Sequence, residues 1–508
     1  MPSRMNSCNL ESVTEDFLGA SGKPPGRLSQ APLRNVLQAL RVGAYDFRAR
    51  FPNEVGPQEA ELLGTAIGRF VKGPFLVGRD PRLESKLFSV ALIRGLSHSS
   101  WPVYNIGIIP TPVAGFEARR AGFVSLVASP SHNAIGYVGL KIFDSNGLPW
   151  GKEWDLFRKA LRANGLVTGL KHLSSHSPPV RHRNTRHCTG RSVVKDRYLR
   201  HVARLSPAPV RVVVDSRGGS TSGWAAMAVR RSGGVVLDLN RGQSSTFHGL
   251  SPEPALDTLG PLRRSVRKFS ADFGVAFDGD GDRAVFVDEQ GVPVPPEVVG
   301  MCLLNIFEGG VGKLVASADL SPKLSTLANV RWSKVGGLNI IQRMKLAQAP
   351  IGLELSGHYY IKTEGFASDG ILTAVAVAHE IWTNKLPLSH YVAEFGDFNR
   401  LIVRIRAHDR RSALAALSNL LGRLAPGARP FCGGWRWKLE PEGSAYGRVS
   451  QTEPTVRLAC EGPPESLSAL IKELRSDSSL DCLNTKPLDP GRFRGWTEVD
   501  FRLHDYDS

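Results

Sequence analysis

One short stretch, Asp278-Gly279-Asp280-Gly281-Asp282-Arg283, restricts the fold of this 508-residue chain more than any other. Three carboxylates occupy alternate positions, and only glycine separates them. Residues 273–277 and 284–288 on either side are apolar and β-branched, so we expect a loop that joins two short strands and directs the carboxylates to one point. Like charges held this close need a counter-ion, and oxygen ligands that leave open positions suit Mg²⁺.

An EF-hand calcium loop is one alternative for the same stretch. Asp278, Asp280, Asp282 and Glu289 fall at its first, third, fifth and twelfth positions. However, the sixth position, which must be glycine for the sharp turn, is Arg283, and strands rather than helices are predicted on both sides. A polar hairpin without a metal is a second alternative, which the repulsion among three carboxylates disfavours.

Length and composition predict a globular protein of several domains. The chain is 42% hydrophobic and 22% charged, and its length corresponds to about three or four domains. The longest apolar run, 371–382, contains His379 and Glu380, so we expect a buried core helix and no membrane span. The six cysteines are far apart without a CxxC pair, and the N-terminus has no apolar signal segment, which predicts a cytoplasmic location.

The net charge of +17 raises the question of a nucleic-acid partner. Basic residues are spread along the chain, apart from one cluster between Arg181 and Arg204 that is typical of a linker running into a helix. Aromatic residues do not alternate with this cluster, as a base-stacking surface requires, so no nucleic-acid binding is expected. A small anionic substrate would also be attracted by this charge.

Predicted strands and helices alternate along most of the chain, which indicates an α/β fold. The pattern restarts at Val210 and again at Leu314, so we expect three similar α/β domains with mixed sheets and polar loops at the strand ends. The last part, with a strand at 399–406 and a helix at 411–424, indicates a smaller α+β domain. The predicted divisions are an N-terminal extension (1–32), domain I (33–180), domain II (190–294), domain III (295–396), domain IV (397–471) and a C-terminal extension (472–508).

Five motifs follow one another along the chain. They are Tyr45-Asp46-Phe47-Arg48; Ser131-His132-Asn133 with Tyr137, Gly139 and Lys141 behind it; the acidic stretch; Glu354-Leu355-Ser356-Gly357-His358; and Arg448 to Pro454. With these motifs in this order, the chain resembles the α-D-phosphohexomutase family, most closely its phosphomannomutase/phosphoglucomutase branch. The resemblance covers roughly residues 33–471 and implies a four-domain phosphohexomutase-like architecture. It also implies interconversion of hexose 6-phosphate and hexose 1-phosphate, with mannose as the first expectation and glucose as the second.

The resemblance implies a mechanism as well. Ser131 would be carried as phosphoserine, pass its phosphoryl group to a sugar-phosphate hydroxyl, and take the other phosphoryl group back from a hexose 1,6-bisphosphate, which would also act as activator. Mg²⁺ would act as a Lewis acid, held by Ser131, Asp278, Asp280 and Asp282. The implied catalytic residues are Ser131, His132, Lys141, Arg283 and Arg48. The implied substrate-binding residues are Tyr45, Glu354, Ser356, His358, Arg448, Ser450, Gln451 and Thr452. The expected partner is a small sugar phosphate, and the expected assembly is a monomer or weak dimer.

Four positions depart from the family pattern. Ala134 stands where proline is usual, Val138 replaces an asparagine, Gly337 replaces a histidine, and the strand end near Asp319 lacks an expected lysine. Two alternatives to the mannose or glucose mutase stay open, and the departures bear on the second. One is a phosphoglucosamine or related sugar-phosphate mutase, which Tyr45 disfavours because that branch usually has Thr-Asp-Gly there. The other is a catalytically weakened relative that binds sugar phosphates.

Overall fold

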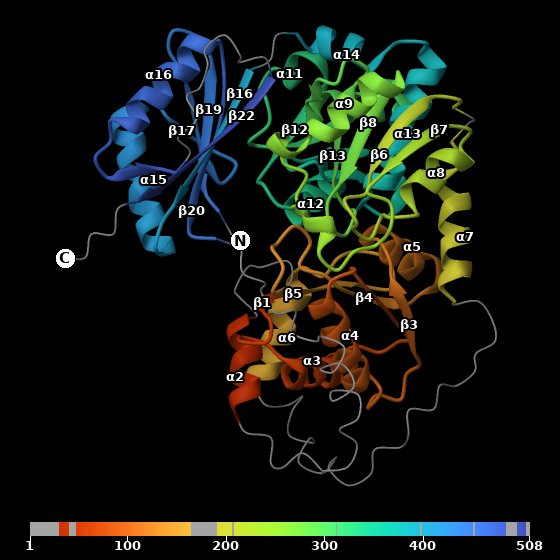
Figure 1. Ribbon diagram of the computed structural model, residues 1–508. Coiled ribbons are helices and arrows are strands. Elements are labelled where there is room, and N and C mark those ends of the chain that lie inside the picture. The colour runs from red at the N-terminus through yellow and green to blue at the C-terminus, as the bar shows by residue number, and fades with distance from the viewer. Residues whose placement is uncertain are drawn as a thin grey trace, which may run out of the picture.

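The structure is a computed structural model, and it describes residues 30–39, 47–163, 190–205, 208–310, 312–396, 399–450, 453–483 and 495–503. Within these residues the strands form four sheets, each built from its own part of the chain (Figure 1). The first three sheets have five strands and the fourth has seven. The expected architecture of three similar α/β domains and a different fourth domain is confirmed.

The strands of domain I have the sheet order β1-β5-β4-β2-β3. They are β1 (Phe47–Arg50), β2 (Phe75–Arg79), β3 (Val103–Ile108), β4 (Val124–Ala128) and β5 (Tyr137–Phe143). The helices of this domain are α2 (Gln30–Ala39), α3 (Pro57–Phe70), α4 (Leu83–Leu96), α5 (Thr111–Ala121) and α6 (Lys152–Arg162). Every residue of β4 is buried, as is typical of a central strand covered by helices on both faces.

The second sheet has the order β10-β9-β8-β6-β7 and the third the order β12-β11-β13-β14-β15. The elements of domain II are α7 (Arg191–Val202), β6 (Arg211–Asp215), α8 (Ala225–Arg231), β7 (Val235–Leu239), α9 (Gly260–Phe269), β8 (Phe273–Phe277), β9 (Ala284–Asp288) and β10 (Pro293–Val294). Those of domain III are α10 (Pro296–Glu308), β11 (Lys313–Ser317), α11 (Leu324–Leu327), β12 (Asn329–Ser333), α12 (Gly337–Ala347), β13 (Ile351–Leu353), β14 (Tyr359–Ile361), β15 (Ala367–Ser368), α13 (Gly370–Asn384) and α14 (Leu388–Phe395).

All three α/β sheets share one pairing pattern. From one edge to the other, two antiparallel pairings are followed by two parallel ones. The central strand, where the pattern changes, is β4 in the first sheet, β8 in the second and β13 in the third. Each central strand leads directly into one of the predicted functional loops, as expected for α/β sheets, whose ligands bind beyond the carboxyl ends of strands.

Domain IV contains a different sheet, in the order β17-β18-β19-β20-β16-β22-β21. Its elements are β16 (Asn399–Arg406), α15 (Arg410–Leu424), β17 (Arg429–Phe431), β18 (Gly434–Lys438), β19 (Ser444–Val449), β20 (Thr455–Glu461), α16 (Pro464–Arg475), β21 (Leu480–Cys482) and β22 (Gly495–Leu503). The segment expected to be a C-terminal extension thus contains two strands of this sheet. One of them, β22, lies in its interior and pairs in parallel with β16.

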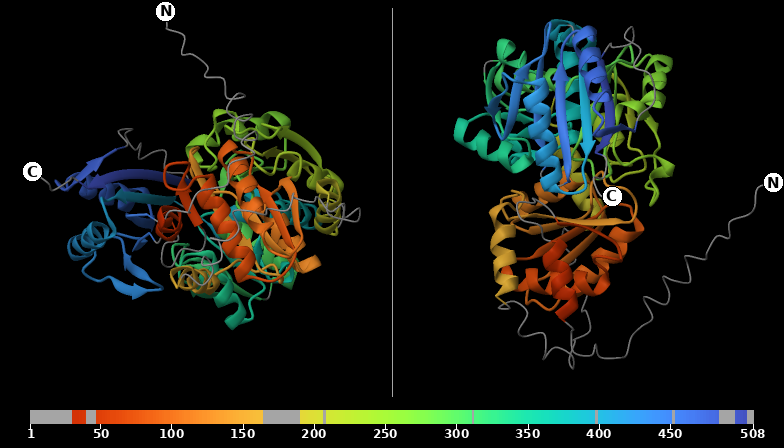
Figure 2. Two further views of the ribbon diagram at one scale, coloured as in Figure 1. Left: turned by 90° about the horizontal axis from the view of Figure 1, so that it is seen from below. Right: turned by 90° about the vertical axis from the view of Figure 1, so that its left-hand side faces the viewer.

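The apolar clusters show how the domains are joined. Each domain has an apolar cluster of its own, and a further large cluster runs through domains II and III and reaches domain I. Helix α13, predicted as a buried core helix, packs in that large cluster. Domain I lies on one side of the pair formed by domains II and III, and domain IV lies on another (Figures 1 and 2). No helix of the described residues has the length and apolarity needed to cross a membrane.

Candidate active site

The acidic stretch forms the hairpin between β8 and β9. Phe277 and Ala284 pair across its base, so strands flank the loop as expected, and the helices of an EF-hand are absent at this place. The carboxylates of Asp278, Asp280 and Asp282 are buried, and one oxygen from each lies within 4.8 Å of the others. The loop therefore brings three carboxyl groups together inside the protein.

The hydrogen-bond donors around this loop leave one carboxylate oxygen of Asp280 available to a cation. Asp280 Oδ2 accepts hydrogen bonds of 2.6 Å from Thr111 Oγ1 and from Lys141 Nζ, and Lys141 Nζ also donates to Asp282 Oδ2 at 2.6 Å. Asp280 Oδ1, by contrast, is buried and accepts no hydrogen bond from any described residue. Because a buried carboxylate oxygen without a partner is costly, and because the set consists of oxygen donors, these residues fit Mg²⁺.

Burial and neighbouring charges give the three carboxylates different acidities. Burial, followed by repulsion from Asp280 and Asp282, raises the pKa of Asp278 well above its ordinary value. Burial also acts on Asp282, but Lys141 and His358 outweigh it and hold the pKa of that carboxyl well below its ordinary value. Burial is outweighed at Lys141 too, because the carboxylates, Asp280 first, raise its pKa. Lys141 is therefore a fixed cation in this arrangement.

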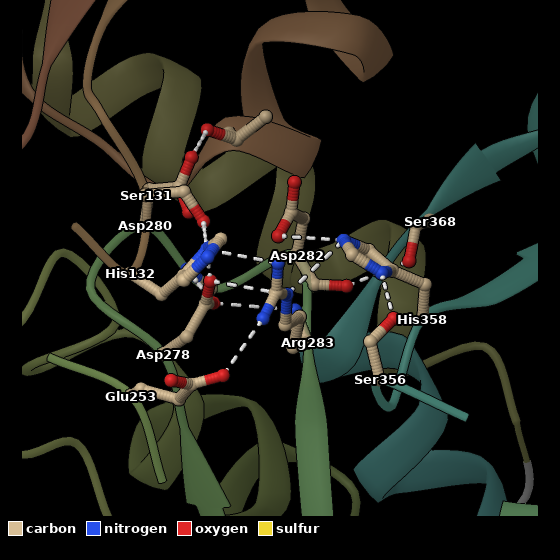
Figure 3. Close-up of polar contacts among 12 residues, drawn as sticks. Ser131, His132, Glu253, Asp278, Asp280, Asp282, Arg283, Ser356, His358 and Ser368 are labelled. Atoms are coloured by element: carbon tan, nitrogen blue, oxygen red, sulfur yellow. Dashed lines mark hydrogen bonds and ion pairs between the residues drawn. The ribbon is translucent and has the colours of Figure 1, made fainter. Parts of the chain in front are cut away.

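Ser131 lies directly opposite the acidic loop, in the turn that follows β4 (Figure 3). Its Oγ donates a 2.8 Å hydrogen bond to Asp278 Oδ2, although the two residues are far apart in the sequence. The neighbouring His132 accepts a 2.9 Å hydrogen bond from Arg283 Nη2 at Nδ1. Burial, and then the charge of Arg283, lowers the pKa of His132 well below its ordinary value, so the imidazole is neutral and Arg283 carries the positive charge here.

The predicted residue Arg48 also reaches this side of the cleft. It donates to the side chain of Asn133, in the same turn as Ser131, and lines the cleft. Ala134, a departure from the family pattern, lies in this turn, and Val138 is a fully buried residue of β5. Tyr45 lies outside the described residues.

The loop after β13 supplies the third side of the site. Ala284 N donates to Gly357 O at 3.0 Å, and Arg283 forms a β-bridge with His358, so the loops of domains II and III are joined. Ser356 Oγ is hydrogen-bonded to His358 Nδ1 at 2.8 Å (Figure 3). Together with Glu354, these side chains line the cleft.

Glu354 is oriented by two protein donors. Its Oε1 accepts from Gly336 N at 2.6 Å, and its Oε2 accepts from Tyr360 Oη at 2.8 Å. A Cβ atom on Gly337 would lie 2.6 Å from Tyr360 Oη, so Tyr360 occupies the space that a side chain at Gly337 would need. At the position where the family pattern has histidine, this chain therefore has Gly337 with the side chain of Tyr360 packed against it. The sequence analysis did not single out Tyr360.

Domain IV closes the cleft with the faces of β16, β19, β20 and β22. The predicted residues Arg448 and Ser450 line the cleft, whereas Gln451 and Thr452 lie outside the described residues. Three further charged residues of this domain line the cleft and were not predicted: Arg404, Arg457 and Glu498. Arg457 is the cross-strand partner of Arg448, a relation that alternation along the predicted strands could have suggested. No sequence signal pointed to Glu498 of β22, which accepts a 2.5 Å hydrogen bond from Arg404 Nη2.

The cleft between the four domains encloses about 370 Å³, within the usual range for small-molecule sites. Its walls carry cations, carboxylates and hydroxyl groups from all four domains. A small anionic ligand with several hydroxyl groups would fit this lining. The arrangement can also bring such a ligand to the Ser131 hydroxyl.

Comparisons with known proteins agree with this picture. Three family models match in order: Phosphoglucomutase/phosphomannomutase, alpha/beta/alpha domain I at residues 39–156, domain II at 196–291 and domain III at 308–398. A phosphoglucosamine mutase of Moorella thermoacetica is 27% identical over 455 residues, covering 83% of this chain and 95% of the relative. A phosphoglucosamine mutase of Rhodococcus erythropolis is 28% identical over 417 residues, covering 76% of this chain and 85% of the relative.

Solved structures show the same fold. A phosphoglucomutase/phosphomannomutase family protein from Burkholderia thailandensis superposes with a TM-score of 0.70 at 20% identity, covering 87% of this chain and 96% of that protein. A phosphoglucomutase from Paramecium, pp63/parafusin in its open form, superposes with a TM-score of 0.66 at 16% identity, covering 89% of this chain and 95% of that protein.

Proposed function

Because the chain belongs to the phosphoglucomutase/phosphomannomutase family of intramolecular phosphotransferases, we propose that it interconverts a hexosamine 6-phosphate and the corresponding hexosamine 1-phosphate, with glucosamine as the sugar. The observation that carries the phosphotransfer is the 2.8 Å hydrogen bond from Ser131 Oγ to the buried Asp278. It supports Ser131 as the proposed nucleophile, because the hydroxyl lies against the acidic loop and Ser131 lines a cleft to which all four domains contribute.

In the proposed cycle, phosphorylated Ser131 passes its phosphoryl group to the free hydroxyl of a bound hexose monophosphate. The Oγ–P bond breaks as the sugar O–P bond forms, and the hydroxyl proton finally resides on Ser131 Oγ, which donates to Asp278. The bisphosphate then turns over in the cleft. Its other phosphoryl group returns to Ser131, and the proton returns to the vacated sugar oxygen. Positioning and charge neutralisation dominate such transfers.

The residues around Ser131 have distinct parts in this cycle. Asp278, Asp280 and Asp282 would hold Mg²⁺, which when bound supplies Lewis-acid stabilisation of the charge on the phosphoryl group. Arg283, hydrogen-bonded to His132, adds a fixed positive charge beside the turn that carries Ser131. Lys141 adds a second cation. The catalytic role that the family resemblance implied for Lys141 stays a prediction. We propose that this role is charge neutralisation and not proton transfer, because the neighbouring carboxylates raise the pKa of Lys141.

The names of the curated relatives favour the amino sugar over the mannose expected from the sequence. Both relatives described above are named phosphoglucosamine mutase. Tyr45, which had disfavoured that substrate, lies outside the described residues. Glu354 and Ser356 are proposed to accept hydrogen bonds from the 3- and 4-hydroxyls, which glucosamine, glucose and mannose have in common. We therefore expect the neutral sugars to be turned over as well, but more weakly than glucosamine.

A coupled assay tests the proposal directly. The 6-phosphates of glucosamine, glucose and mannose are compared, each with a catalytic amount of its 1,6-bisphosphate, and we expect the highest kcat/KM for glucosamine. Absence of turnover with all three would contradict the proposed mutase and favour the weakened sugar-phosphate-binding relative. A preference for mannose or glucose would contradict the amino-sugar assignment alone.

Intact-mass spectrometry tests the nucleophile. The wild-type protein should be isolated partly phosphorylated, and Ser131→Ala should remove both the phosphorylated species and the activity. Phosphate retained on the Ser131→Ala protein would place the nucleophile elsewhere in the chain, with Ser129 as the nearest alternative.

A further inference from the structure

We propose that Arg82, Asp80 and Ser129 form a buried brace that holds Ser131 in the conformation from which its hydroxyl reaches the acidic loop. In this view Arg82 is a positioning residue for phosphoryl transfer, although it does not touch the reacting atoms. The inference rests on the proposed function, because it assigns the brace a role in the chemistry of Ser131.

Ser131 has a backbone conformation that needs support. Its φ angle is +54°, in the left-handed region that a residue with a side chain rarely adopts. Such a conformation persists only where the surrounding structure imposes it, and it is typical of functional sites. Because φ sets the direction of the Cα–Cβ bond, a relaxed backbone at Ser131 would point Oγ away from Asp278.

Arg82 holds the carbonyl side of the turn. Its side chain is fully buried, and Nη2 donates to Ser131 O at 2.9 Å and also to Asn133 O. One planar guanidinium group thus binds two carbonyl groups two residues apart, which a lysine ammonium cannot do with the same geometry. Asp80 orients Arg82 in turn, because its carboxylate accepts from Nη1 and, at 3.0 Å, from the backbone N–H of Arg82.

Ser129 holds the amide side of the same turn. Ser129 Oγ donates to Asp80 Oδ2 at 2.9 Å and accepts from Ser131 N at 3.0 Å. Asp80 is therefore connected to Ser131 by two routes, through Arg82 to its carbonyl and through Ser129 to its amide. Since Ser129 is fully buried and both its bonds serve this turn, the structure assigns it a positioning role and not a nucleophilic one.

Domain II secures the brace from the opposite side. The Arg82 guanidinium lies over the ring of Phe247 at 4.6 Å from its centre. A Cβ atom on Gly279 would come within 2.9 Å of Ser131 O, so the acidic loop approaches the turn as closely as a glycine permits. The brace thus lies where the Ser131 turn of domain I meets the acidic loop of domain II.

The domain repeat offers a matched control for Arg82. Strands β2 and β6 occupy the same place in their sheets, and the backbone N–H of Arg217 after β6 bonds Asp215 at 2.9 Å, as that of Arg82 bonds Asp80. Arg217 is also buried, but its Nε donates to Ser251 O at 2.8 Å and not to the Ser131 turn. Replacement of either arginine removes a buried guanidinium, yet only Arg82 supports the nucleophile.

The test compares Arg82→Lys, Ser129→Ala and Arg217→Lys with the wild type. A misplacement of reacting groups by about 1 Å can cost roughly a hundredfold in rate, so we expect a loss of this order in kcat for Arg82→Lys, with KM nearly unchanged. Ser129→Ala, which removes only one hydroxyl group, should lower kcat in the same manner. Phosphorylation of Ser131 by the sugar bisphosphate in a single turnover should slow in parallel, whereas Arg217→Lys should keep the wild-type rate.

Thermal unfolding distinguishes positioning from plain stability. If Arg82→Lys and Ser129→Ala lower the melting temperature but keep the wild-type kcat per folded molecule, the brace is structural only and the proposal is wrong. Equal losses of kcat in Arg82→Lys and Arg217→Lys would also overturn it. A wild-type protein inactive on every hexose phosphate would instead refute the proposed function, an outcome separate from both.

Discussion

At the scale of single residues, the site depends on an uneven distribution of charge among neighbouring acidic groups. Asp278 accepts the Ser131 hydroxyl, whereas Asp280 and Asp282 share the Lys141 ammonium group. The stretch of alternating aspartates therefore separates into one acceptor for the nucleophile and a pair held by a cation. Among these three aspartates, Asp280 is the one whose Oδ2 accepts two hydrogen bonds while its Oδ1 accepts none from the described residues.

Asp280→Asn tests the metal assignment, because it keeps the shape and removes one charge. A metal ion contributes several kcal/mol to such a reaction, so activity should fall about a hundredfold or more. Mg²⁺ should raise the melting temperature of the wild type by binding the folded state, and this increase should be absent in the variant. Equal stabilisation of both proteins by Mg²⁺ would place the ion elsewhere.

The buried carboxyl group of Asp369, the N-cap of α13, should make the stability of the protein depend on pH. Burial raises its pKa to about 6, although Tyr198 Oη donates to it at 2.7 Å. The carboxyl group loses its proton at about pH 4 in the unfolded chain but at about pH 6 in the folded protein. The free energy of unfolding should therefore fall as the pH rises from about 4 to 6, by a total on the order of 3 kcal/mol.

Asp369→Asn cannot ionise, so its stability relative to the wild type should increase between about pH 4 and 6 and level off above. Calorimetric melting of both proteins across this range measures the difference. A difference that stays constant with pH would show that Asp369 has an ordinary pKa.

At the scale of elements, β22 shows how a segment distant from every recognised motif becomes part of the site. It lies between β16 and β21, pairs with eight residues of β16, and carries Glu498 into the cleft beside Arg404. Arg404, Arg457 and Arg448 are cross-strand neighbours on the cleft side of this sheet. Because like charges opposite one another destabilise a sheet, Glu498 and Asp500 of β22 offset the charge of Arg404.

Phe501→Ala tests whether β22 is an integral strand of domain IV. Phe501 is fully buried in the core of that domain, so the change should destabilise it by about 3 to 5 kcal/mol. Hydrogen exchange should rise in β16 and β20, while domains I to III keep their protection. Leu483→Ala, at a side chain that is 46% exposed in the same segment, is the control and should have little effect. Unchanged protection in Phe501→Ala would mean that β22 is dispensable.

At the scale of the whole molecule, two arginines of domain IV contact domain III. Arg400 of β16 is buried and bonds Glu297 at the start of α10. Arg436 donates to Ala318 O at 2.7 Å, and its guanidinium lies over the rings of Trp332 and Phe431. These contacts lie at the junction of the two domains. We expect domain IV to rotate about them and to narrow the cleft when a ligand contacts its walls.

Arg448→Ala tests this closure. The arginine should bind the phosphate that is not being transferred, and that phosphate is held alike in ground and transition states. A loss of roughly 1.5 to 3 kcal/mol, tenfold to hundredfold in kcat/KM, should therefore appear mainly in KM. Small-angle scattering should show that substrate compacts the wild type more than the variant. A large fall in kcat with KM unchanged would place Arg448 at the transferring phosphoryl group instead.

The sequence by itself determined the features that depend on neighbouring residues. Apolar and β-branched runs predicted β8 and β9, the repeated alternation predicted three α/β domains, and the spacing of Asp278, Asp280 and Asp282 predicted that their carboxylates converge. Each of these follows from local backbone periodicity and from short loops that leave side chains little freedom of direction. The role of Ser131 had a different source, because it was implied by the resemblance of its motif to the α-D-phosphohexomutase family.

Only the tertiary structure decided which of these local features meet. Lys141 between two aspartates, Arg82 beneath the Ser131 turn, Tyr360 against Gly337 and Glu498 in the cleft all bring together residues from different elements. Periodicity along one strand predicts which of its faces is buried, but it does not identify the distant strand or loop that will pack against that face. The charges, pKa shifts and close contacts of the site arise from that packing, because burial and long-range neighbours set them and local sequence does not.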